Sequence, residues 1–188
     1  MIERILIMVV CVLLSAYFSA TETAFSSANK TRLKAMAEKG NKRAKLAFRL
    51  SEDYDHLISS ILIGNNIVNI ALASIGTLVF VDIWGHSGAT ISTIVITIVV
   101  LIFGEITPKS VAKDIPEQFA MFSAPFINLL MILLTPLTFL FGKWKLLVSR
   151  LFKSNQDTKM SQDELLLLLN EVQQEGTIDE SEGELLKN

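Results

Sequence analysis

The sequence predicts an all-α membrane protein with three transmembrane helices, amphipathic juxtamembrane helices and an acidic cytoplasmic helical linker. Hydrophobic residues make up 51% of the 188-residue chain, and they are grouped in long blocks rather than spread periodically. Several of these blocks approach the length of about 20 apolar residues with which a helix crosses a bilayer. Charge is segregated as well: residues 30–49 hold eight Lys or Arg and one acid, whereas residues 160–188 hold eight acids and one base.

The first predicted span covers residues 4–27. Its short charged start and apolar core also resemble a secretory signal peptide, but cleavage would place the basic segment that follows outside the cell. We therefore interpret it as a membrane helix. Residues 30–51 alternate basic and apolar residues at helical spacing, with an interruption at Gly40-Asn41, which predicts two amphipathic helices at the cytoplasmic surface. The positive-inside rule then puts the amino terminus outside and the carboxyl end in the cytoplasm.

The second and third spans are predicted at residues 55–81 and 88–112, joined by an external loop without Lys or Arg. Residues 116–150 form a membrane-dipping juxtamembrane segment, because basic residues flank its apolar stretch on both sides and Pro125 and Pro136 interrupt it. We expect a bent hairpin or a juxtamembrane helix there, and a fourth complete crossing is the alternative.

Residues 1–153 are thus predicted to be a transmembrane domain, and residues 154–188 an acidic cytoplasmic helical linker. Within the linker, Ser161 and Glu164 have the spacing of a capping box that opens a helix. The helical pattern still continues at Asn188, so we expect a cytoplasmic domain to follow it.

Polar residues interrupt the first two spans in ordered positions. In the first span they fall on one helical face, and in the second span two amides share a face while a third lies about 100° round. These residues are Ser19, Glu22, Thr23 and Ser26, then Asn65 and Asn69, and finally Asn66. Ionisable groups at membrane depth usually mark ion pathways. The alternative is interhelical hydrogen bonding, which we favour for isolated residues such as Ser15.

The third span ends in the sequence Gly104-Glu105-Ile106-Thr107-Pro108-Lys109. In an α-helix Pro108 cannot donate to the carbonyl four residues back, so the Gly104 oxygen is free beside the Glu105 carboxylate. All these candidate donors are oxygens, while His56 and His86 fall at opposite membrane faces and Cys11 is the single cysteine. Hard oxygen ligands favour Mg²⁺, Na⁺ or Ca²⁺ over zinc, copper or iron.

Three motifs, Ser19-Ala20-Thr21-Glu22-Thr23-Ala24, Gly64-Asn65-Asn66 with Asn69, and the Gly104–Lys109 segment, make the chain similar to the CNNM/CorC family of magnesium transporters along its whole length. The resemblance implies a homodimer that binds a dehydrated Mg²⁺. It implies the metal ligands Ser19, Asn65, Asn69, the Gly104 carbonyl and Glu105, with Glu22, Thr23, Asn66 and Pro108 in the ion pathway or its structural support. The chain departs from many relatives at Ala20-Thr21, where they have Gly-Ser.

Together these observations predict a Mg²⁺ transporter of the inner (plasma) membrane, with Na⁺-coupled efflux as the resemblance suggests. The family's CBS modules, through which ATP would act, are missing from this sequence. The alternative is a Mg²⁺-sensing scaffold without transport activity. We do not expect an enzyme, because the spans lack paired histidines and no base lies near Ser19 or Ser26. The partners expected are the bilayer, a second copy and the missing modules, but no nucleic acid.

Overall fold

A computed structural model describes the backbone of residues 1–151 and the side chains of residues 1–136. All elements within these residues are helices, which confirms the predicted fold class. The chain divides into two compact units, Met1–Lys143 and Trp144–Asn188, and the candidate site lies in the first. The predicted acidic linker, with its capping box at Ser161, lies outside the described residues.

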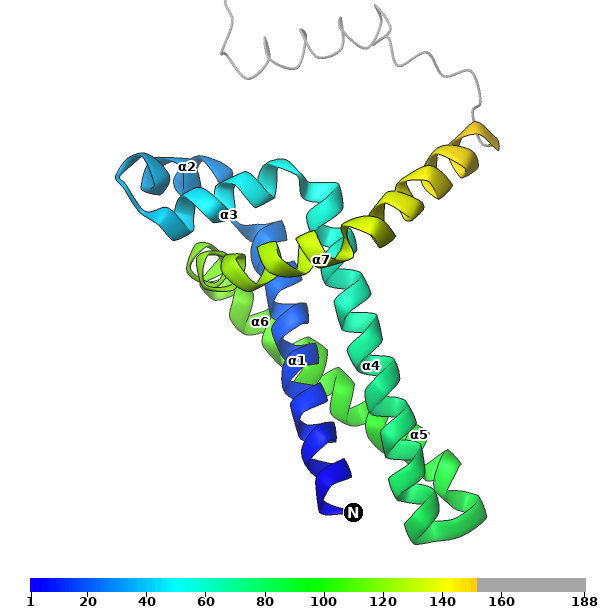
Figure 1. Cartoon of the computed structure of the whole chain (residues 1–188). Coiled ribbons are helices and arrows are strands. Elements are labelled where there is room, and N and C mark those ends of the chain that lie inside the picture. The colour runs from blue at the N-terminus through cyan, green and yellow to red at the C-terminus, as the bar shows by residue number, and fades with distance from the viewer. Residues whose placement is uncertain (152–188) are drawn as a thin grey trace, which may run out of the picture. The chain divides into compact units, whose positions relative to one another are not determined.

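The centre of the first unit is a pair of antiparallel helices, α1 (Ile2–Ser27) and α4 (Tyr54–Trp84) (Figure 1). A short 3₁₀ turn, Gly85–Ser87, reverses the chain into α5 (Gly88–Val99). The helix then continues through a π-helical segment, η2 (Val100–Ile106), and α6 (Thr107–Asp114) back towards the carboxyl end of α1. The helical stretches Ile2–Ser27 and Tyr54–Asp114 are long and apolar enough to cross a membrane, the second of them twice because of its turn.

Two short basic helices, α2 (Lys30–Glu38) and α3 (Lys42–Glu52), follow α1, as the spacing of basic and apolar residues predicts. Asn29 and Asn41 begin them by accepting hydrogen bonds from backbone N–H groups of the first turn. Gly40 separates them with a φ of 91°, a conformation that glycine adopts without strain. The end of the molecule that carries α2 and α3 is called the basic end below.

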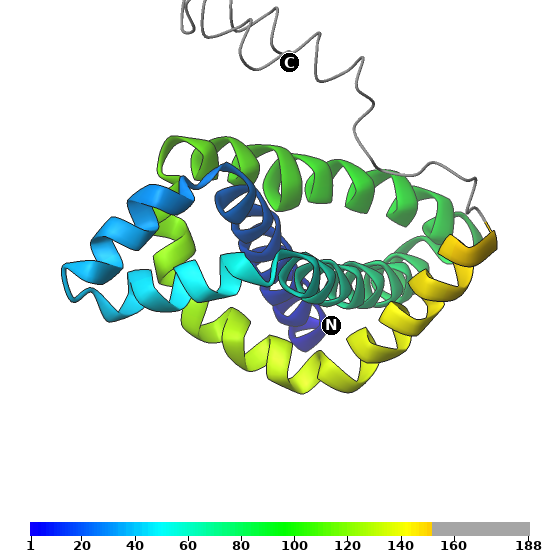
Figure 2. The same ribbon diagram turned by 90° about the horizontal axis from the view of Figure 1, so that it is seen from above.

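The long helix α7 (Pro116–Leu151) contains both Pro125 and Pro136 without a break. The continuous helix shows that the expected bent hairpin is wrong, while the juxtamembrane position of α7 and the alternative of a fourth crossing stay predictions. Up to Lys143, α7 runs across α1 and α4 on the side opposite α5 (Figures 1 and 2). This transverse course suits a helix at the membrane surface, although Pro116–Pro136 is also long and apolar enough to cross.

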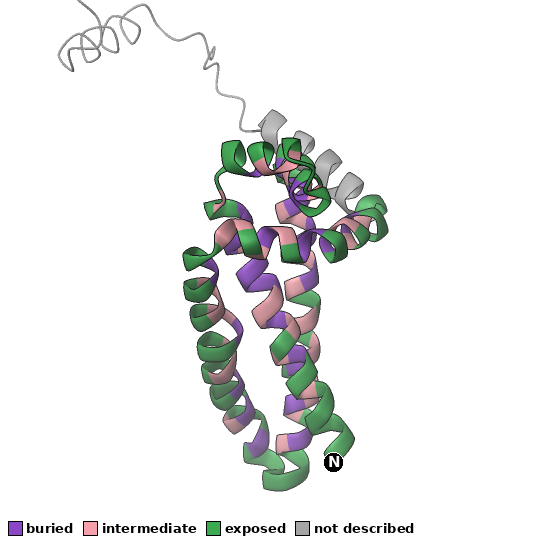
Figure 3. Cartoon of the chain, turned by 90° about the vertical axis from the view of Figure 1, so that its left-hand side faces the viewer, coloured by how far each residue is buried: buried purple, intermediate pink, exposed green. Residues whose placement is uncertain are grey.

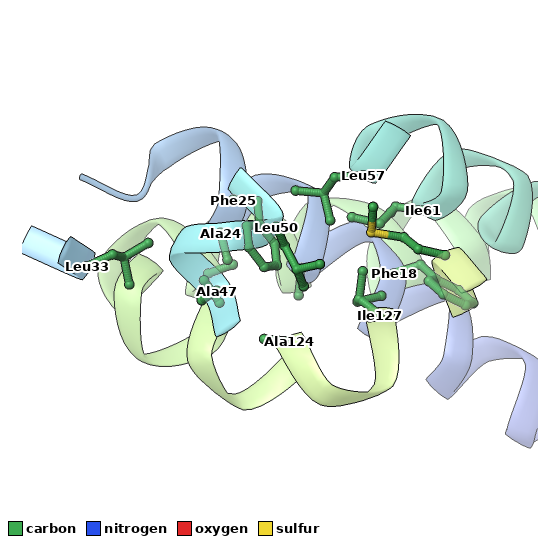
Figure 4. Close-up of a cluster of buried hydrophobic side chains, with 14 residues drawn as sticks. Phe18, Ala24, Phe25, Leu33, Ala47, Leu50, Leu57, Ile61, Ala124 and Ile127 are labelled. Atoms are coloured by element: carbon green, nitrogen blue, oxygen red, sulfur yellow. The ribbon is translucent and has the colours of Figure 1, made fainter. Parts of the chain in front are cut away.

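The apolar faces of α2 and α3 pack on α7 and on the adjoining ends of α1 and α4. Figure 4 shows this core, in which Leu33, Ala47, Ala124 and Ile127 have no exposed surface. Polar contacts surround it: the Arg32 guanidinium lies 3.4 Å from Glu117, and Arg49 donates to the side-chain oxygen of Asn128 at 3.1 Å. The basic helices are thus fixed to α7 and leave their charges outside.

Tyr17 joins α1 to α7. Its hydroxyl donates to the backbone oxygen of Ser123 at 3.2 Å, and its ring packs against Phe119, Phe122 and Phe126, with centroid distances of 5.5–6.4 Å. Edge-on aromatic contacts of this kind add to the stabilisation from buried area. This group of rings is called the Tyr17 clamp below.

Buried residues lie where the helices face one another, and the outward faces of the spans are exposed (Figure 3). Many of the exposed residues are large and apolar. Leu13, Ile70 and Leu78 are 64%, 66% and 55% exposed. A surface of this composition would aggregate in water but is stable against lipid tails. The small residue Gly64 lets three helices meet in the interior, since a Cβ there would lie 2.8 Å from Phe18 Cζ and 3.3 Å from Leu130 Cδ2.

Replacing Gly64 by Ala should therefore lower the thermal unfolding temperature in detergent, because Phe18 is buried and cannot yield freely. Overpacking of this kind costs about 1–3 kcal/mol. The control is Ala73→Val, which enlarges an exposed position of the same helix. Equal unfolding temperatures for Gly64→Ala and Ala73→Val would contradict the close packing of α1, α4 and α7.

Candidate metal site

A stripe of small polar residues runs along α1 where it faces α4 and η2. Ser15 and Ser19 are 0% and 1% exposed, and Thr23 is 8% exposed. The Ser15 hydroxyl donates to the side-chain oxygen of Asn65 at 3.2 Å, so the expected interhelical hydrogen bond is confirmed. The hydroxyl of Ser19 has no hydrogen-bond partner among the described residues.

The amides of α4 separate into different environments. Asn65 faces α1 through its bond with Ser15, and the oxygen of Asn69 is buried without a partner among residues 1–136. Asn66 is exposed, as its position about 100° round the helix requires. The three amides therefore do not form one cluster, and Asn66 lies apart from the other two.

The third part of the site is η2 (Val100–Ile106), a π-helical segment that the sequence did not reveal. Here the N–H of Thr107 donates to the oxygen of Ile102, five residues back. Pro108 follows with no N–H, and α6 (Thr107–Asp114) then resumes the four-residue pattern. The backbone carbonyl oxygens of residues 103–105 are consequently more numerous than the amide hydrogens within hydrogen-bonding reach of them.

This geometry corrects the expectation that Pro108 frees the Gly104 oxygen alone. In the five-residue pattern the carbonyl opposite Pro108 belongs to Phe103, and in the four-residue pattern it belongs to Gly104. The change of pattern leaves both short of donors. Gly104 itself is buried against α1, and a Cβ there would lie 3.0 Å from the Ser15 hydroxyl. Ser15, Asn65 and Gly104 therefore bring α1, α4 and η2 together at one point.

The two carboxylates expected near the site differ in their contacts. Glu105 is half-buried, and no hydrogen bond or ion pair holds it within the described part of the chain. Glu22 pairs with the ammonium of Lys109 at 3.2 Å, which links α1 to α6 nearer the basic end. Glu105 is thus available to a ligand, whereas Glu22 is already engaged.

The antiparallel course of α1 and α4 sets the relative height of the two unpartnered oxygens. Ser19 lies one turn from Ser15 towards the basic end, and Asn69 lies one turn from Asn65 towards the other end. Each step is about 6 Å along the helix axis. Mg²⁺ binds its ligands at about 2.1 Å, so Ser19 and Asn69 could share one ion only after a shift of the helices.

The arrangement suits a small hard cation. Buried oxygens without partners are costly, and a metal ion would remove that cost. No three His, Cys, Asp or Glu residues come together in the described part of the chain, so a site here must use mainly neutral oxygens. Ser60 and Ser92 also carry buried unpartnered hydroxyls, so this property alone does not identify a ligand. What distinguishes Ser19 and Asn69 is their position either side of the Ser15–Asn65 contact.

Sequence reasoning did not place Ser15 at this centre. It is four residues before Ser19, hence on the same helical face, and that spacing was the available signal. Away from the basic end, α1, α4 and α5 line a partly open apolar cavity of about 280 Å³, with Met8, Val12, Leu72 and Ile96 among its lining residues. Between the Ser15–Asn65 contact and the basic end, by contrast, α1 carries polar side chains.

Comparison with known proteins agrees with this architecture. The family described as "Cyclin M transmembrane N-terminal domain" matches residues 6–182. A UPF0053 protein of Haemophilus influenzae is 39% identical over 170 residues, which are 89% of this chain and 40% of the relative. The UPF0053 inner membrane protein YfjD of Escherichia coli is 38% identical over 162 residues, 84% of this chain and 38% of the relative. The chain thus spans about two fifths of the length of these two relatives.

A more distant relative carries a name that states a cargo. The polyamine export protein of Haemophilus influenzae is 25% identical over 201 residues, which cover 99% of this chain and 46% of that protein.

Gly104→Ala should weaken Mg²⁺ binding, because the added methyl group would lie 3.0 Å from the Ser15 hydroxyl and displace it by a few tenths of an ångström from its contact with Asn65. Ser15→Ala in the same chain should restore part of the affinity, since it removes the oxygen that the methyl group meets. Titration of both single variants and the double variant measures this coupling. Strictly additive losses would mean that Ser15 and Gly104 do not meet, and Phe103→Leu, on the exposed face, is the control.

Proposed function

Because the chain belongs to the Cyclin M transmembrane domain family, we propose that it binds a dehydrated Mg²⁺ within the membrane and carries it outward in exchange for Na⁺. The observation that carries this proposal is the pair of buried, unpartnered oxygens of Ser19 and Asn69 on either side of the Ser15–Asn65–Gly104 contact. Oxygens in such positions can replace the water shell of a small hard cation.

The proposed ligands are the side-chain oxygens of Ser19, Asn65 and Asn69, the Gly104 carbonyl and the Glu105 carboxylate. The deficit of donors around Pro108 supports the carbonyl, and the unengaged carboxylate supports Glu105. The separation of Ser19 from Asn69 along the helices suggests that the ion exchanges one for the other as it moves. Alternating access would then be a shift of α1 against α4.

The name of the Escherichia coli relative supports an inner-membrane location. The basic residues of α2 and α3 support a cytoplasmic basic end, with the amino terminus outside. We also propose a homodimer, and regulation by ATP through CBS modules, on the resemblance to the family.

Asn69→Ala and Glu105→Gln should each weaken Mg²⁺ binding about tenfold or more, because the first removes an oxygen ligand and the second removes the negative charge of the site, each worth roughly 1–3 kcal/mol. Calorimetric titration of the purified protein in detergent, with Na⁺ and Ca²⁺ as competitors, gives the affinities. Ser74→Ala is the matched control, since its exposed hydroxyl bonds only to the backbone of its own helix. Wild-type affinity in both variants would remove the site assignment.

Transport itself is tested in proteoliposomes loaded with Mg²⁺. The expected result is loss of internal Mg²⁺ that accelerates when Na⁺ is added outside, and the Glu105→Gln variant should abolish it. A protein that binds Mg²⁺ in solution yet never dissipates the gradient would be a sensing scaffold, the alternative expected from the sequence.

Organic polycations are a second candidate cargo. The name of one Haemophilus influenzae relative supports them, and so does the Glu22 carboxylate, which already holds the primary ammonium of Lys109. Spermidine added to the titration decides between the two classes. Displacement of Mg²⁺ by spermidine at equal concentration would favour the polycation, and indifference to it would favour Mg²⁺.

A further inference from the structure

The polar stripe on α1 becomes more exposed turn by turn as it approaches the basic end. Ser15 and Ser19 are 0% and 1% exposed, the side chain of Glu22 is 28% exposed, and Ser26 is exposed. Away from the basic end, apolar side chains line the cavity between the helices, and Ile96 packs against Gly76. Solvent therefore approaches the centre along α1 from the basic end.

Glu22 is the first carboxylate on that route, and a cation of the protein itself occupies it. The Lys109 ammonium lies 3.2 Å from Glu22 Oε2, and its side chain is 40% exposed. Lys109 belongs to α6, which packs on α1, so the pair spans the two elements that flank the route. A positive charge at this point repels any other cation that approaches the centre.

Lys109 also has a second carboxylate within one helical turn. Glu105 lies four residues earlier on the same helical run, across the junction of η2 and α6. Two carboxylates and one ammonium leave one negative charge unbalanced. A divalent ion bound at Glu105 would make the net charge of this group positive and weaken the attraction between Glu22 and Lys109.

We infer that Lys109 is a tethered cation that gates the basic end of the site: its ammonium holds Glu22, and a Mg²⁺ or Na⁺ passing between solvent and centre must displace it. This inference rests on the proposed function for the identity of the passing ion. A merely structural role is the competing interpretation, in which the pair only braces α1 against α6. The two interpretations differ in whether the pair controls access to the stripe.

Access from solvent to the polar stripe can be measured without Mg²⁺, from the reactivity of a single cysteine. Cys11→Ser removes the sole native cysteine, and Thr23→Cys places a thiol four residues from Ser19, at a position 8% exposed. Iodoacetamide is small and neutral, so a change in protein charge does not alter its approach. Because the thiolate is the reacting species, the rate in Mg²⁺-free buffer is divided by the thiolate fraction taken from the pH profile of each variant, and the corrected rate reports how often the basic end of the site is open.

Lys109→Gln in this background should speed the reaction about fivefold, the effect that loss of one partly exposed ion pair can supply. The exchanged pair Glu22→Lys with Lys109→Glu should return the rate to within about twofold of the parent, since the attraction is rebuilt. Arg32→Gln breaks the Arg32–Glu117 pair near the same end but off the stripe, and should leave the rate unchanged. Unfolding temperatures are measured for every variant.

A Lys109→Gln rate equal to the parent would overturn the gate. So would an equal acceleration in Arg32→Gln, or an acceleration that the exchanged pair does not reverse, because in either case the faster reaction does not come from the loss of the Glu22–Lys109 pair. The Mg²⁺ titration of the parent protein is independent of this result. Absence of Mg²⁺ binding there refutes the proposed cargo, whereas an unaltered labelling rate refutes only the role of Lys109.

Discussion

The absence of one amide hydrogen, that of Pro108, is the constraint on which the rest of the site depends. The helical run from Gly88 to Asp114 cannot keep a regular hydrogen-bond ladder past this residue, and it changes to a π-helical pattern before the proline. The change leaves backbone oxygens near Gly104 short of donors at membrane depth. Such oxygens persist there only when buried in protein or facing a polar cavity, and the close contact of Gly104 with Ser15 supplies the burial.

Much of the fold could be predicted because its signals are local. Long apolar blocks gave the spans, and Gly40-Asn41 marked the division between the two basic helices. The hairpin form considered for residues 116–141 is wrong, because the rule that prolines break helices takes no account of the packing that keeps α7 continuous around Pro125. Local signals therefore fail where tertiary contacts decide the backbone.

For the site, the sequence predicted only which residues share a face of the same helix. Helical spacing put Ser19 and Glu22 on one side of α1 and separated Asn66 from Asn65, but spacing does not give the register between two helices. That register makes Ser15 the residue that meets Asn65 and Gly104, and it sets Ser19 and Asn69 at different heights. The pairing of Glu22 with Lys109 was likewise hidden, because it joins segments 87 positions apart whose contact is fixed only by packing.

The Tyr17 clamp has a mechanical consequence. Tyr17 lies between Ser15 and Ser19 in sequence, but its side chain contacts α7 instead of α4. The same part of α1 therefore carries the serine hydroxyls on one side and the Tyr17 ring on the other. A rotation of α1 that moved Ser19 would also shift the Tyr17 ring against the rings of α7 or break the hydrogen bond from its hydroxyl to Ser123. A displacement of α1 would therefore be passed directly to α7.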